Sequence, residues 1–454
     1  MPKVFSSVLL SLLVLLARQA YAQPLSLADA VQTALAHNPE VAAADQDIAV
    51  LRTRIDQVRS YAHPKADILL NVTAFEQQPM MEVPAFVLPL PAQLGGPKLI
   101  KTPDLPLADS TLAFGAVNVQ YPISTGGRVA AHLAQVQEGI KAVNARAKAT
   151  RYEVTFNVVK AYLSAAFAAR VATVNDETYA TVKQHEAQAA ALFKQGMVPK
   201  YEWMRAQTEV ANQERRCLDA HNQAELAIAY LQDLLGTTPG EPFTLTTPLR
   251  GEEPFDMDLT VVKAKALDAS EYLKALQARD RMYLVGEHSA DAELHPTLAA
   301  VAAQRLFINK QPFTSPGGFL GIIARIPLLD GGLAKAERQE QAALRVRNQD
   351  DIRQVTNGIN LEVRKCYLDL LSARKALEAA DKTVELAQES LRLATRRFAE
   401  AQGTGVEQTD AVLALSLAQI NREQARYQYD LAYYALKKML GQILDEFQPG
   451  RVSA

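Results

Sequence analysis

Few residues in this chain have the type and spacing that enzymatic or metal chemistry requires. The seven histidines are scattered, and no His-x-x-x-His or Cys-x-x-Cys pair occurs that could hold zinc. There is no Gly-x-Ser-x-Gly sequence to present a serine nucleophile and no Gly-x-x-x-x-Gly-Lys-Ser/Thr loop to hold nucleotide phosphates. The sequence therefore predicts no enzyme, no metal site and no cofactor.

One pair of carboxylates could act together. Glu407 and Asp410 are three residues apart, so a helix would carry both on one face. Such a pair can attract cations, but acidic side chains also suit an ordinary solvated helix start because they favour the helix dipole. The two cysteines, Cys217 and Cys366, are too few for a disulfide framework. We expect both to be buried free thiols, because the helices outlined below separate them by about 25 Å.

The N-terminus has the pattern of an export signal. Lys3 precedes an apolar run at 8–16, and Ala20-Tyr21-Ala22 has the small-x-small form of a cleavage site, which predicts a signal peptide at 1–22. The alternative, a membrane anchor, would need a longer apolar segment. The formal net charge of the chain is −2, and loss of the signal peptide removes two cations. A charge this close to zero argues against a nucleic-acid partner.

The mature sequence contains an internal duplication. Residues 121–127, Tyr-Pro-Ile-Ser-Thr-Gly-Gly, recur as 326–332, Ile-Pro-Leu-Leu-Asp-Gly-Gly, 205 positions later. Upstream, a shift of 232 relates the His-Pro pairs at 63–64 and 295–296. Each half predicts helix, strand, variable loop, strand, long helix, short break and helix. We predict a first repeat at 23–240, a linker at 241–256, a second repeat at 257–441 and a C-terminal tail at 442–454.

The predicted helices are long and regular. Residues 128–194 contain no proline and a single glycine, Gly139, and 333–402 likewise contain only Gly358. A continuous helix of this length would span about 100 Å. Apolar residues recur every seven positions with small residues three places on, which predicts a left-handed coiled coil. In the second half the heptad residues are Val363, Leu370, Leu377, Val384, Leu391 and Phe398. The first half keeps a weaker seam, interrupted at Asn175 and Glu186.

Four segments between the helices are typical of strands. Residues 66–74 alternate apolar and polar side chains, as a membrane-barrel strand does. Residues 111–121 change phase near the middle, which indicates a bulge, while 297–308 and 319–326 are apolar on both faces and would also suit a buried sandwich. Four strands cannot close a barrel, and lipid does not tolerate an open sheet edge. If these strands cross a membrane, several subunits must share one barrel.

In this order of elements the chain resembles the TolC-type outer-membrane efflux proteins. The resemblance rests on the Ala34-Leu35-Ala36-His37-Asn38-Pro39 segment, the duplicated Pro-to-Gly-Gly turn, and the Leu-Gly helix ends at 235–236 and 440–441. It implies a homotrimer in which long antiparallel coiled-coil hairpins form an α-barrel, and four strands per subunit form a shared 12-stranded β-barrel. It also implies outer membrane lipid around the barrel, a periplasmic adaptor, and an inner-membrane pump of the RND, ABC or MFS type.

The resemblance assigns roles to three groups of residues. The strand-to-helix turns contain Pro122, Gly126, Gly127, Pro327, Gly331 and Gly332, where proline would end the strand ladder and glycine permits tight backbone angles. The hairpin tips, 194–200 and 399–406, would contact the adaptor through Gly196, Met197, Val198, Gly403, Thr404 and Gly405. The periplasmic entrance would be lined by Glu407, Asp410, Glu202 and Phe398.

The chain departs from the family at the tips. The family's closed tips carry a Tyr and an Arg that latch neighbouring helices, and Phe398 and Gly403 stand at those positions here. We therefore expect an entrance held by packing. Residues 76–111, with seven prolines, predict an extracellular loop that either plugs the channel or is a tolerated surface insertion. The competing function is a periplasmic adaptor, which also has coiled-coil hairpins, although adaptors normally carry one hairpin and a compact β-rich domain.

Overall fold

The computed structural model describes residues 23–107, 110–236, 243–251, 255–308, 317–400 and 402–447. The predicted signal peptide, the loop at 309–316, parts of the linker and the end of the C-terminal tail lie outside these residues. The chain divides into two compact units. The helical unit comprises the residues up to Ala49, Lys141–Gln277 and the residues from Gln349 onward; the sheet unit comprises Val50–Ile140 and Ala278–Asn348. Each unit takes segments from both sequence repeats.

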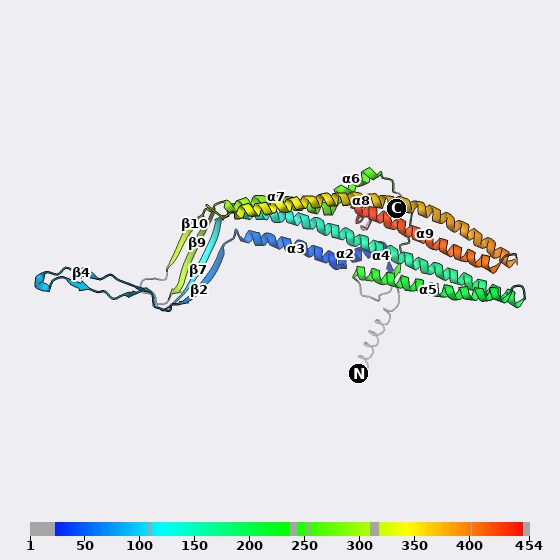
Figure 1. Cartoon of the computed structure of the whole chain (residues 1–454), viewed down its shortest axis with the longest axis horizontal. Coiled ribbons are helices and arrows are strands. Elements are labelled where there is room, and N and C mark those ends of the chain that lie inside the picture. The colour runs from blue at the N-terminus through cyan, green and yellow to red at the C-terminus, as the bar shows by residue number, and fades with distance from the viewer. Residues whose placement is uncertain are drawn as a thin grey trace, which may run out of the picture. The chain divides into compact units, whose positions relative to one another are not determined.

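Two pairs of long helices dominate the chain (Figure 1). The two longest, α4 and α8, have 67 residues each and begin 205 positions apart, the shift that relates the two Pro-to-Gly-Gly turns. No helix in the described ranges is both long and apolar enough to cross a membrane. The helices are α2 (Leu27–His37), α3 (Pro39–Ser60), α4 (Arg128–Lys194), α5 (Lys200–Leu235), α6 (Leu259–Ala269), α7 (Glu271–Asp291), α8 (Leu333–Ala399) and α9 (Gly405–Met439), with short 3₁₀ turns η1 (Ala92–Leu94), η2 (Ala292–Leu294) and η3 (Asp445–Phe447).

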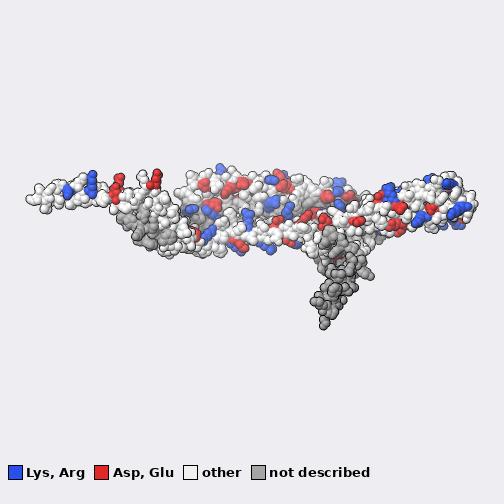
Figure 2. All heavy atoms as spheres, turned by 90° about the horizontal axis from the view of Figure 1, so that it is seen from below, with Lys and Arg blue, Asp and Glu red and all other residues white. Residues whose placement is uncertain are grey.

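The predicted heptad seam packs as expected. Val363, Leu370, Leu377, Val384 and Phe398 are all buried, and α8 and α9 share one apolar cluster with α6. In the first half α4 packs on α5 through small residues such as Ala172 and Ala220. The short side chains let the helix backbones approach closely, as the sequence predicts. On the surface shown in Figure 2, acidic and basic residues are interspersed over the helices.

Polar residues that interrupt the first seam are satisfied by hydrogen bonds. Asn175 donates to the Val171 carbonyl at 2.9 Å, and its side-chain oxygen accepts from Gln213 at 3.0 Å. Glu186 accepts from the Trp203 indole nitrogen at 2.6 Å. These bonds offset the cost of placing polar groups where the heptad calls for apolar ones. The interruptions therefore cross-link α4 to α5 rather than ending the helix.

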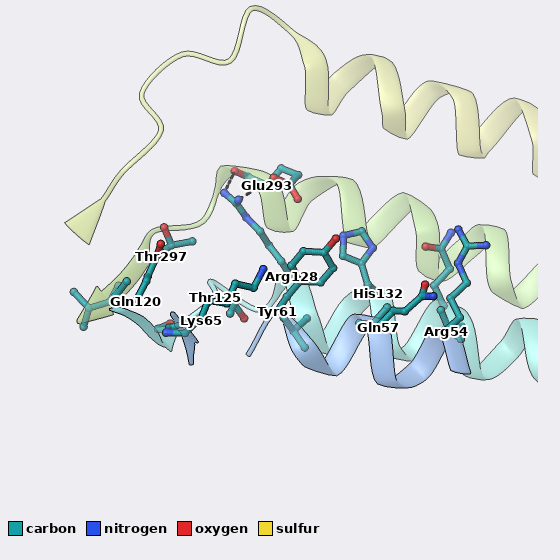
Figure 3. Close-up of a pocket in the computed structure, with 18 residues that line it drawn as sticks. Arg54, Gln57, Tyr61, Lys65, Gln120, Thr125, Arg128, His132, Glu293 and Thr297 are labelled. Carbon is teal, nitrogen blue, oxygen red and sulfur yellow. Dashed lines mark hydrogen bonds and ion pairs between the residues drawn. The ribbon is translucent and has the colours of Figure 1, made fainter. Parts of the chain in front are cut away.

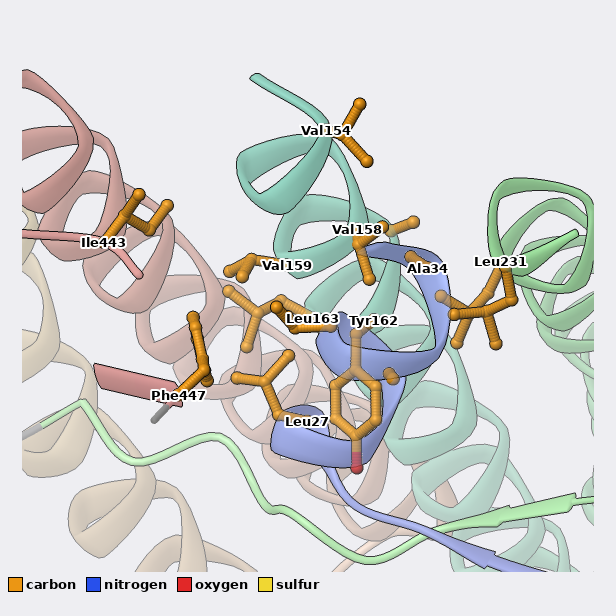
Figure 4. Packing of buried hydrophobic residues seen from close by; sticks show 14 of the residues in the cluster. Leu27, Ala34, Val154, Val158, Val159, Tyr162, Leu163, Leu231, Ile443 and Phe447 are labelled. Carbon is orange, nitrogen blue, oxygen red and sulfur yellow. The ribbon is translucent and has the colours of Figure 1, made fainter. Parts of the chain in front are cut away.

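The largest apolar core of the helical unit lies where α2 packs on α4 and α5 (Figure 4). The C-terminal residues Ile443 and Phe447 also enter this cluster. Tyr162 is fully buried there, and its hydroxyl donates to the Leu25 carbonyl and accepts from the Thr247 N–H, each at 2.9 Å. That hydroxyl connects β1 to the segment that follows β8, beside the parallel β1–β8 ladder.

The cysteines are both free, but only one is buried as expected. Cys366 belongs to the α8 seam, and burial raises the pKa of its thiol to about 11. Cys217 on α5 is half-exposed, so the prediction of a buried thiol is wrong there. It lies outside the described apolar clusters of that unit.

The sheet unit contains one four-stranded antiparallel sheet in the order β10-β9-β7-β2. The first repeat supplies the β2–β7 hairpin, the second supplies β9 and β10, and β7 pairs with β9 to join them. The strands are β1 (Gln23–Leu25), β2 (Lys65–Ala74), β3 (Met80–Met81), β4 (Phe86–Leu88), β5 (Lys98–Ile100), β6 (Leu105–Pro106), β7 (Thr111–Ser124), β8 (Phe243–Leu245), β9 (Thr297–Ile308) and β10 (Gly318–Arg325).

The predicted bulge lies in a different strand. β7 pairs with β2 without interruption from Gln120 to Thr111. Against β9, the pairs Gly115–Phe307 and Ala116–Arg305 leave Leu306 unmatched. The extra residue is therefore on β9 rather than in 111–121. In β7 the apolar residues change from one side of the strand to the other next to this bulge, because a bulge alters the pairing of both strands.

The register gives the sheet two different faces. Residues opposite each other in an antiparallel ladder project to the same side, so the pairings trace each face across all four strands. One face is apolar and open to solvent, with Val72 74% exposed and Leu320 83% exposed. Its large side chains are Ile68, Leu70, Val72, Val117, Val119, Tyr121, Leu320 and Ile322. We call this the apolar face.

The second face is mixed, and we call it the polar face. It carries Lys65, Asp67, Asn71 and Thr73 from β2, Asn118 and Gln120 from β7, and Arg325 from β10, together with the apolar side chains Leu69, Leu112, Phe114, Val301, Phe319 and Ile323. Asn118 donates to the Asp67 carboxylate across the ladder at 3.0 Å. The alternation in 66–74 thus gives β2 one apolar and one polar side, while the other three strands place apolar side chains on both faces. The faces of β9 and β10 could not be assigned from the sequence, because both strands are apolar in both phases.

The stretch 76–111 has more structure than the predicted loop. β3 pairs with β6 and β4 pairs with β5, so residues 80–106 form a ribbon with two short ladders. Thr111 belongs to β7 rather than to the loop. Prolines flank the ladders, which keeps them short because proline cannot donate a ladder hydrogen bond.

Candidate functional site

The first hairpin tip joins α4 to α5 in the helical unit. Gly196 has φ +73°, and its N–H donates to the Phe193 carbonyl at 2.9 Å, which closes the end of α4. Pro199 then precedes the first residue of α5, where its fixed φ suits a helix start. The predicted tip, 194–200, brackets this break. Gly196 and Met197 are exposed, with Met197 57% exposed, and Val198 is half-buried.

The second tip joins α8 to α9 by a different closure. The Arg397 carbonyl accepts from the N–H groups of Gln402 and Gly403 at 2.8 and 3.0 Å. Thr404 caps α9, because its hydroxyl accepts from the Glu407 N–H at 3.2 Å. Gly403 is half-buried and Thr404 is exposed, so both can be reached from outside. Gly405 is buried, so among the predicted adaptor contacts it lies inside the tip.

The two tips pack against each other around His185. We call His185, Glu202, Phe398 and Gly405 the tip cluster. His185 on α4 is 5% exposed, and its ring meets Phe398 on α8 edge-on with centroids 5.0 Å apart. A Cβ added to Gly405 would lie 2.8 Å from a Glu202 carboxylate oxygen and 3.6 Å from the Phe398 ring. Only a residue without a side chain lets α9 approach this closely.

Burial affects the protonation of His185. It lowers the pKa of His185, with the Gly405 backbone and the Glu202 carboxylate acting in the opposite direction. His185 Nδ1 has no hydrogen-bond partner among the described atoms. A neutral imidazole tolerates this environment, whereas an imidazolium would place an unpaired N–H beside an aromatic ring. His185 is therefore packed in its neutral form.

The predicted entrance residues have different surroundings. Phe398 is 4% exposed and belongs to the tip cluster. Glu407 lies on the surface of α9, with a carboxylate oxygen 3.3 Å from an Arg397 guanidinium nitrogen. Asp410 is exposed one turn further along, and Glu202 is half-buried against Gly405. Arg397 thus brings a cation to this tip. It directly precedes Phe398, the position at which the family's closed tips carry a tyrosine.

The strand-to-helix turns have the backbone angles that the glycines predict. Gly126, Gly127, Gly331 and Gly332 all have positive φ. A Cβ on Gly126 would meet the Pro296 carbonyl oxygen at 2.9 Å, so that glycine is also needed for a close approach. His295 Nδ1 lies 3.0 Å from the Gly126 carbonyl, which gives the His-Pro pair at 295–296 a packing role.

Proline ends the ladder in only one of these turns. Pro327 follows the end of β10 as expected, but Pro122 lies within β7, where it pairs with Ala299 and the ladder continues to Ser124. The prediction for Pro122 is therefore wrong on the β9 side. In the second turn Asp330 caps α8, accepting from the N–H groups of Gly332 and Ala334 at 2.9 and 2.8 Å. These bonds lower the pKa of the Asp330 carboxyl.

Sequence reasoning missed three residues of the tips: His185, Arg397 and Trp203. Trp203 stacks on Phe193 with centroids 5.6 Å apart, besides its bond to Glu186. His185 lies outside the heptad positions, so its burial leaves no periodic signal. Arg397 and Glu407 are ten residues apart across a turn, a spacing with no local meaning. Across the described ranges, no three His, Cys, Asp or Glu side chains gather as a metal site.

Comparisons with known proteins agree on one fold. Residues 30–237 and 264–442 match the family described as outer membrane efflux protein. The chain is similar to the CmeC outer membrane channel of Campylobacter jejuni, with a TM-score of 0.72 and 14% identity over 92% of this chain and 86% of CmeC. It is similar to VceC of Vibrio cholerae, with a TM-score of 0.70 and 16% identity over 91% of this chain and 96% of VceC.

A third similar structure is the open state of the MtrE outer membrane channel of Neisseria gonorrhoeae. Its TM-score is 0.72, with 15% identity over 93% of this chain and 91% of MtrE. No curated protein matches the sequence. At these identities the structural matches establish the shared fold, and the family match rests on the sequence itself.

Proposed function

This chain belongs to the outer membrane efflux protein family, and we propose that it is the subunit of a homotrimeric outer-membrane channel that conducts its substrates passively. The fold is that of the TolC-type channels: long antiparallel coiled-coil hairpins combined with a small antiparallel sheet. We place the tips of the hairpins in the periplasm and the sheet in the outer membrane.

The observation that carries this proposal is the sheet. It is narrow, its apolar face is exposed, and its outer strands β2 and β10 pair on one side only within the described chain. An isolated subunit would be unfavourable in water because of its exposed apolar area, and unfavourable in lipid because of its free strand edges. Burying both requires lipid around the sheet and another strand at each edge.

Copies of this chain can supply those strands. The four strands alternate in direction, so β2 and β10 run opposite ways. β10 of one copy can then pair antiparallel with β2 of the next without breaking the alternation. Three copies give twelve strands, an even number within the range of outer-membrane barrels.

We propose that the tips face a periplasmic adaptor, which connects the channel to an inner-membrane pump of the RND, ABC or MFS type. Gly196, Met197, Gly403 and Thr404 supply the reachable surface of the tips. The entrance is held by packing at the tip cluster, with Glu407 and Asp410 near its rim. We expect substantial conductance from the unmodified channel. A conductance that is low in the wild type and rises sharply only on tip mutation would argue against this expectation.

The proposal is tested by labelling intact cells that express Gln93→Cys with Cys217→Ser and Cys366→Ser. Gln93 is exposed in the ribbon that follows β2. A membrane-impermeant maleimide should reach Cys at this position from outside, and the protein should sediment in the outer-membrane fraction as heat-resistant trimers. Labelling only after the outer membrane is permeabilised would place the ribbon in the periplasm. The barrel assignment would then fall, and a periplasmic adaptor would be the better interpretation.

A further inference from the structure

A cavity of about 690 Å³ lies in the sheet unit where strands give way to helices (Figure 3). Its walls come from the end of α3, the start of β2, the end of β7, the start of α4, the turn η2 and the start of β9. Figure 3 shows Lys65, Gln120 and Thr297 at the sheet end, with Arg54 and Gln57 at the helix end. This volume accommodates a small organic ion with its first water molecules.

The side chains that line this junction cavity are mostly hydrogen-bond donors. Arg54, Lys65 and Arg128 contribute three cationic side chains, and Glu293 is the only carboxylate among the described residues of the lining. Gln57, Gln120, Thr125 and Thr297 add amide and hydroxyl groups. Donors of this kind, arranged around water, suit the oxygens of a carboxylate or a phosphate.

The positive charges differ in their availability. Arg128 is engaged, because it lies 3.1 Å from the Glu293 carboxylate and donates to the carbonyls of Ala292 and Glu293. Lys65 is exposed, with its ammonium 4.7 Å from the centre of the Tyr61 ring. Arg54 is also exposed and has no ion pair with any described side chain. Glu293 is neutralised by Arg128, which leaves Arg54 and Lys65 to bind a ligand.

The strand register shows which way the cavity opens. Lys65 lies opposite Gln120, and Pro122 lies opposite Ala299, and all four line the cavity. These residues belong to the polar face, whereas Ile68 and Leu70 project from the other side of the same sheet. A ligand in the cavity therefore approaches through water rather than through an acyl-chain layer. Arg325, opposite Thr297, adds another cation to this face.

We propose that the junction cavity binds small carboxylate- or phosphate-bearing solutes as they pass through the channel, with Arg54 and Lys65 as the main anion ligands. The inference rests on the proposed function, because only a channel whose apolar face meets lipid turns the polar face toward a lumen. Asp67 lies two residues further along β2 on the same face, but its carboxylate accepts from Asn118. The cavity therefore indicates that the channel prefers anionic substrates, a substrate class that the sequence alone does not identify.

The test measures citrate and inorganic phosphate binding to purified trimers by calorimetry at low salt. Arg54→Gln with Lys65→Gln should weaken binding by at least about tenfold, since two charge-assisted contacts are lost. Arg52→Gln is the matched control, because Arg52 is exposed on the same helix and does not line the cavity. That control should bind both anions as the wild type does, and rising salt should weaken all binding.

Several results would overturn the inference. Binding that is equal in the double variant and the wild type would remove the cavity as the site. Binding of a short-chain phosphatidylglycerol but of neither citrate nor phosphate would indicate a lipid site instead. Heat-resistant trimers that conduct but bind neither anion would refute this inference alone. Failure to form conducting trimers would refute the channel proposal and this inference with it.

Discussion

Acidification should loosen the tip cluster, because His185 is packed there in its neutral form. The groups that face its ring come from three other elements: Phe398 on α8, the Gly405 backbone on α9 and Glu202 on α5. Burial lowers the pKa of His185 in the packed tip, whereas in an opened tip the imidazole would return to its usual value of 6.5. The opened tip therefore binds more protons at mildly acidic pH.

The sign and size of the effect follow from proton linkage. The packed tip has its full stability above pH 6.5 and loses it as the pH falls toward the lowered pKa of the packed state. One proton contributes at most about 1.4 kcal/mol per pH unit in this window. Between neutral pH and about pH 5.5 the opening equilibrium can therefore rise by up to about tenfold. Below the lowered pKa the effect should level off.

The chain carries its own probe for this change. Trp203 is the only tryptophan, and it stacks on Phe193 and bonds Glu186 at the same tip. Acrylamide quenching of its fluorescence should increase as the pH falls from about 7.5 to about 5.5 in wild-type trimers. His185→Gln removes the titrating group at similar size and should abolish the increase. His221→Gln is the matched control, because His221 is exposed beside Asp176.

Two results would contradict this reasoning. Quenching that does not change in the wild type across the pH range would show that protonation of His185 does not loosen the tip around Trp203. An equal increase in His185→Gln would show that a group other than His185 causes the change. Retention of the pH response in His221→Gln is required for either comparison to be informative.

Three further predictions concern stability and reactivity. Gly126→Ala should destabilise the sheet unit by about 1 kcal/mol or more, because its φ is positive and a Cβ would lie 2.9 Å from a backbone carbonyl oxygen. Gly127→Ala should cost less, because a Cβ there would lie in open space. The melting temperatures of the two variant trimers would compare these costs. Tyr162→Phe should cost about 1–3 kcal/mol in denaturant unfolding, since two backbone groups in the core lose their partner. At neutral pH Cys217 should react with maleimide well before Cys366, whose thiol has a pKa of about 11 and is buried; comparable rates by mass spectrometry would show that α8 opens readily.

Features encoded by local periodicity could be predicted from the sequence. The heptad at Val363, Leu370 and Leu377 becomes the buried seam of α8, because a seven-residue repeat fixes one helix face whatever packs against it. The alternation in 66–74 likewise becomes the two faces of β2. Glycine-rich turns were predictable because only glycine readily adopts positive φ, as at Gly126 and Gly331.

Features that depend on distant pairing could not be predicted. β9 and β10 are apolar in both phases, so their faces became clear only from their register with β7. The tip cluster brings His185 to Phe398, more than two hundred positions away, and no spacing in the sequence encodes that contact. The lining of the junction cavity comes from three separate segments, 54–65, 120–136 and 293–299, and no spacing in the sequence indicates that they meet.

In the proposed conduit, the charges that have no ion pair are of opposite sign at the sheet end and at the tips. At the tips, Arg397 offsets Glu407, whereas Glu202 and Asp410 have no ion pair among the described residues. An exposed ion pair adds little stability, but it still cancels the field that a passing ion would experience. In the junction cavity the carboxylate is the neutralised group, and Arg54 and Lys65 keep their charge. Three copies of that cavity around one lumen would therefore attract anions at the sheet end, in contrast to the carboxylates left at the tips.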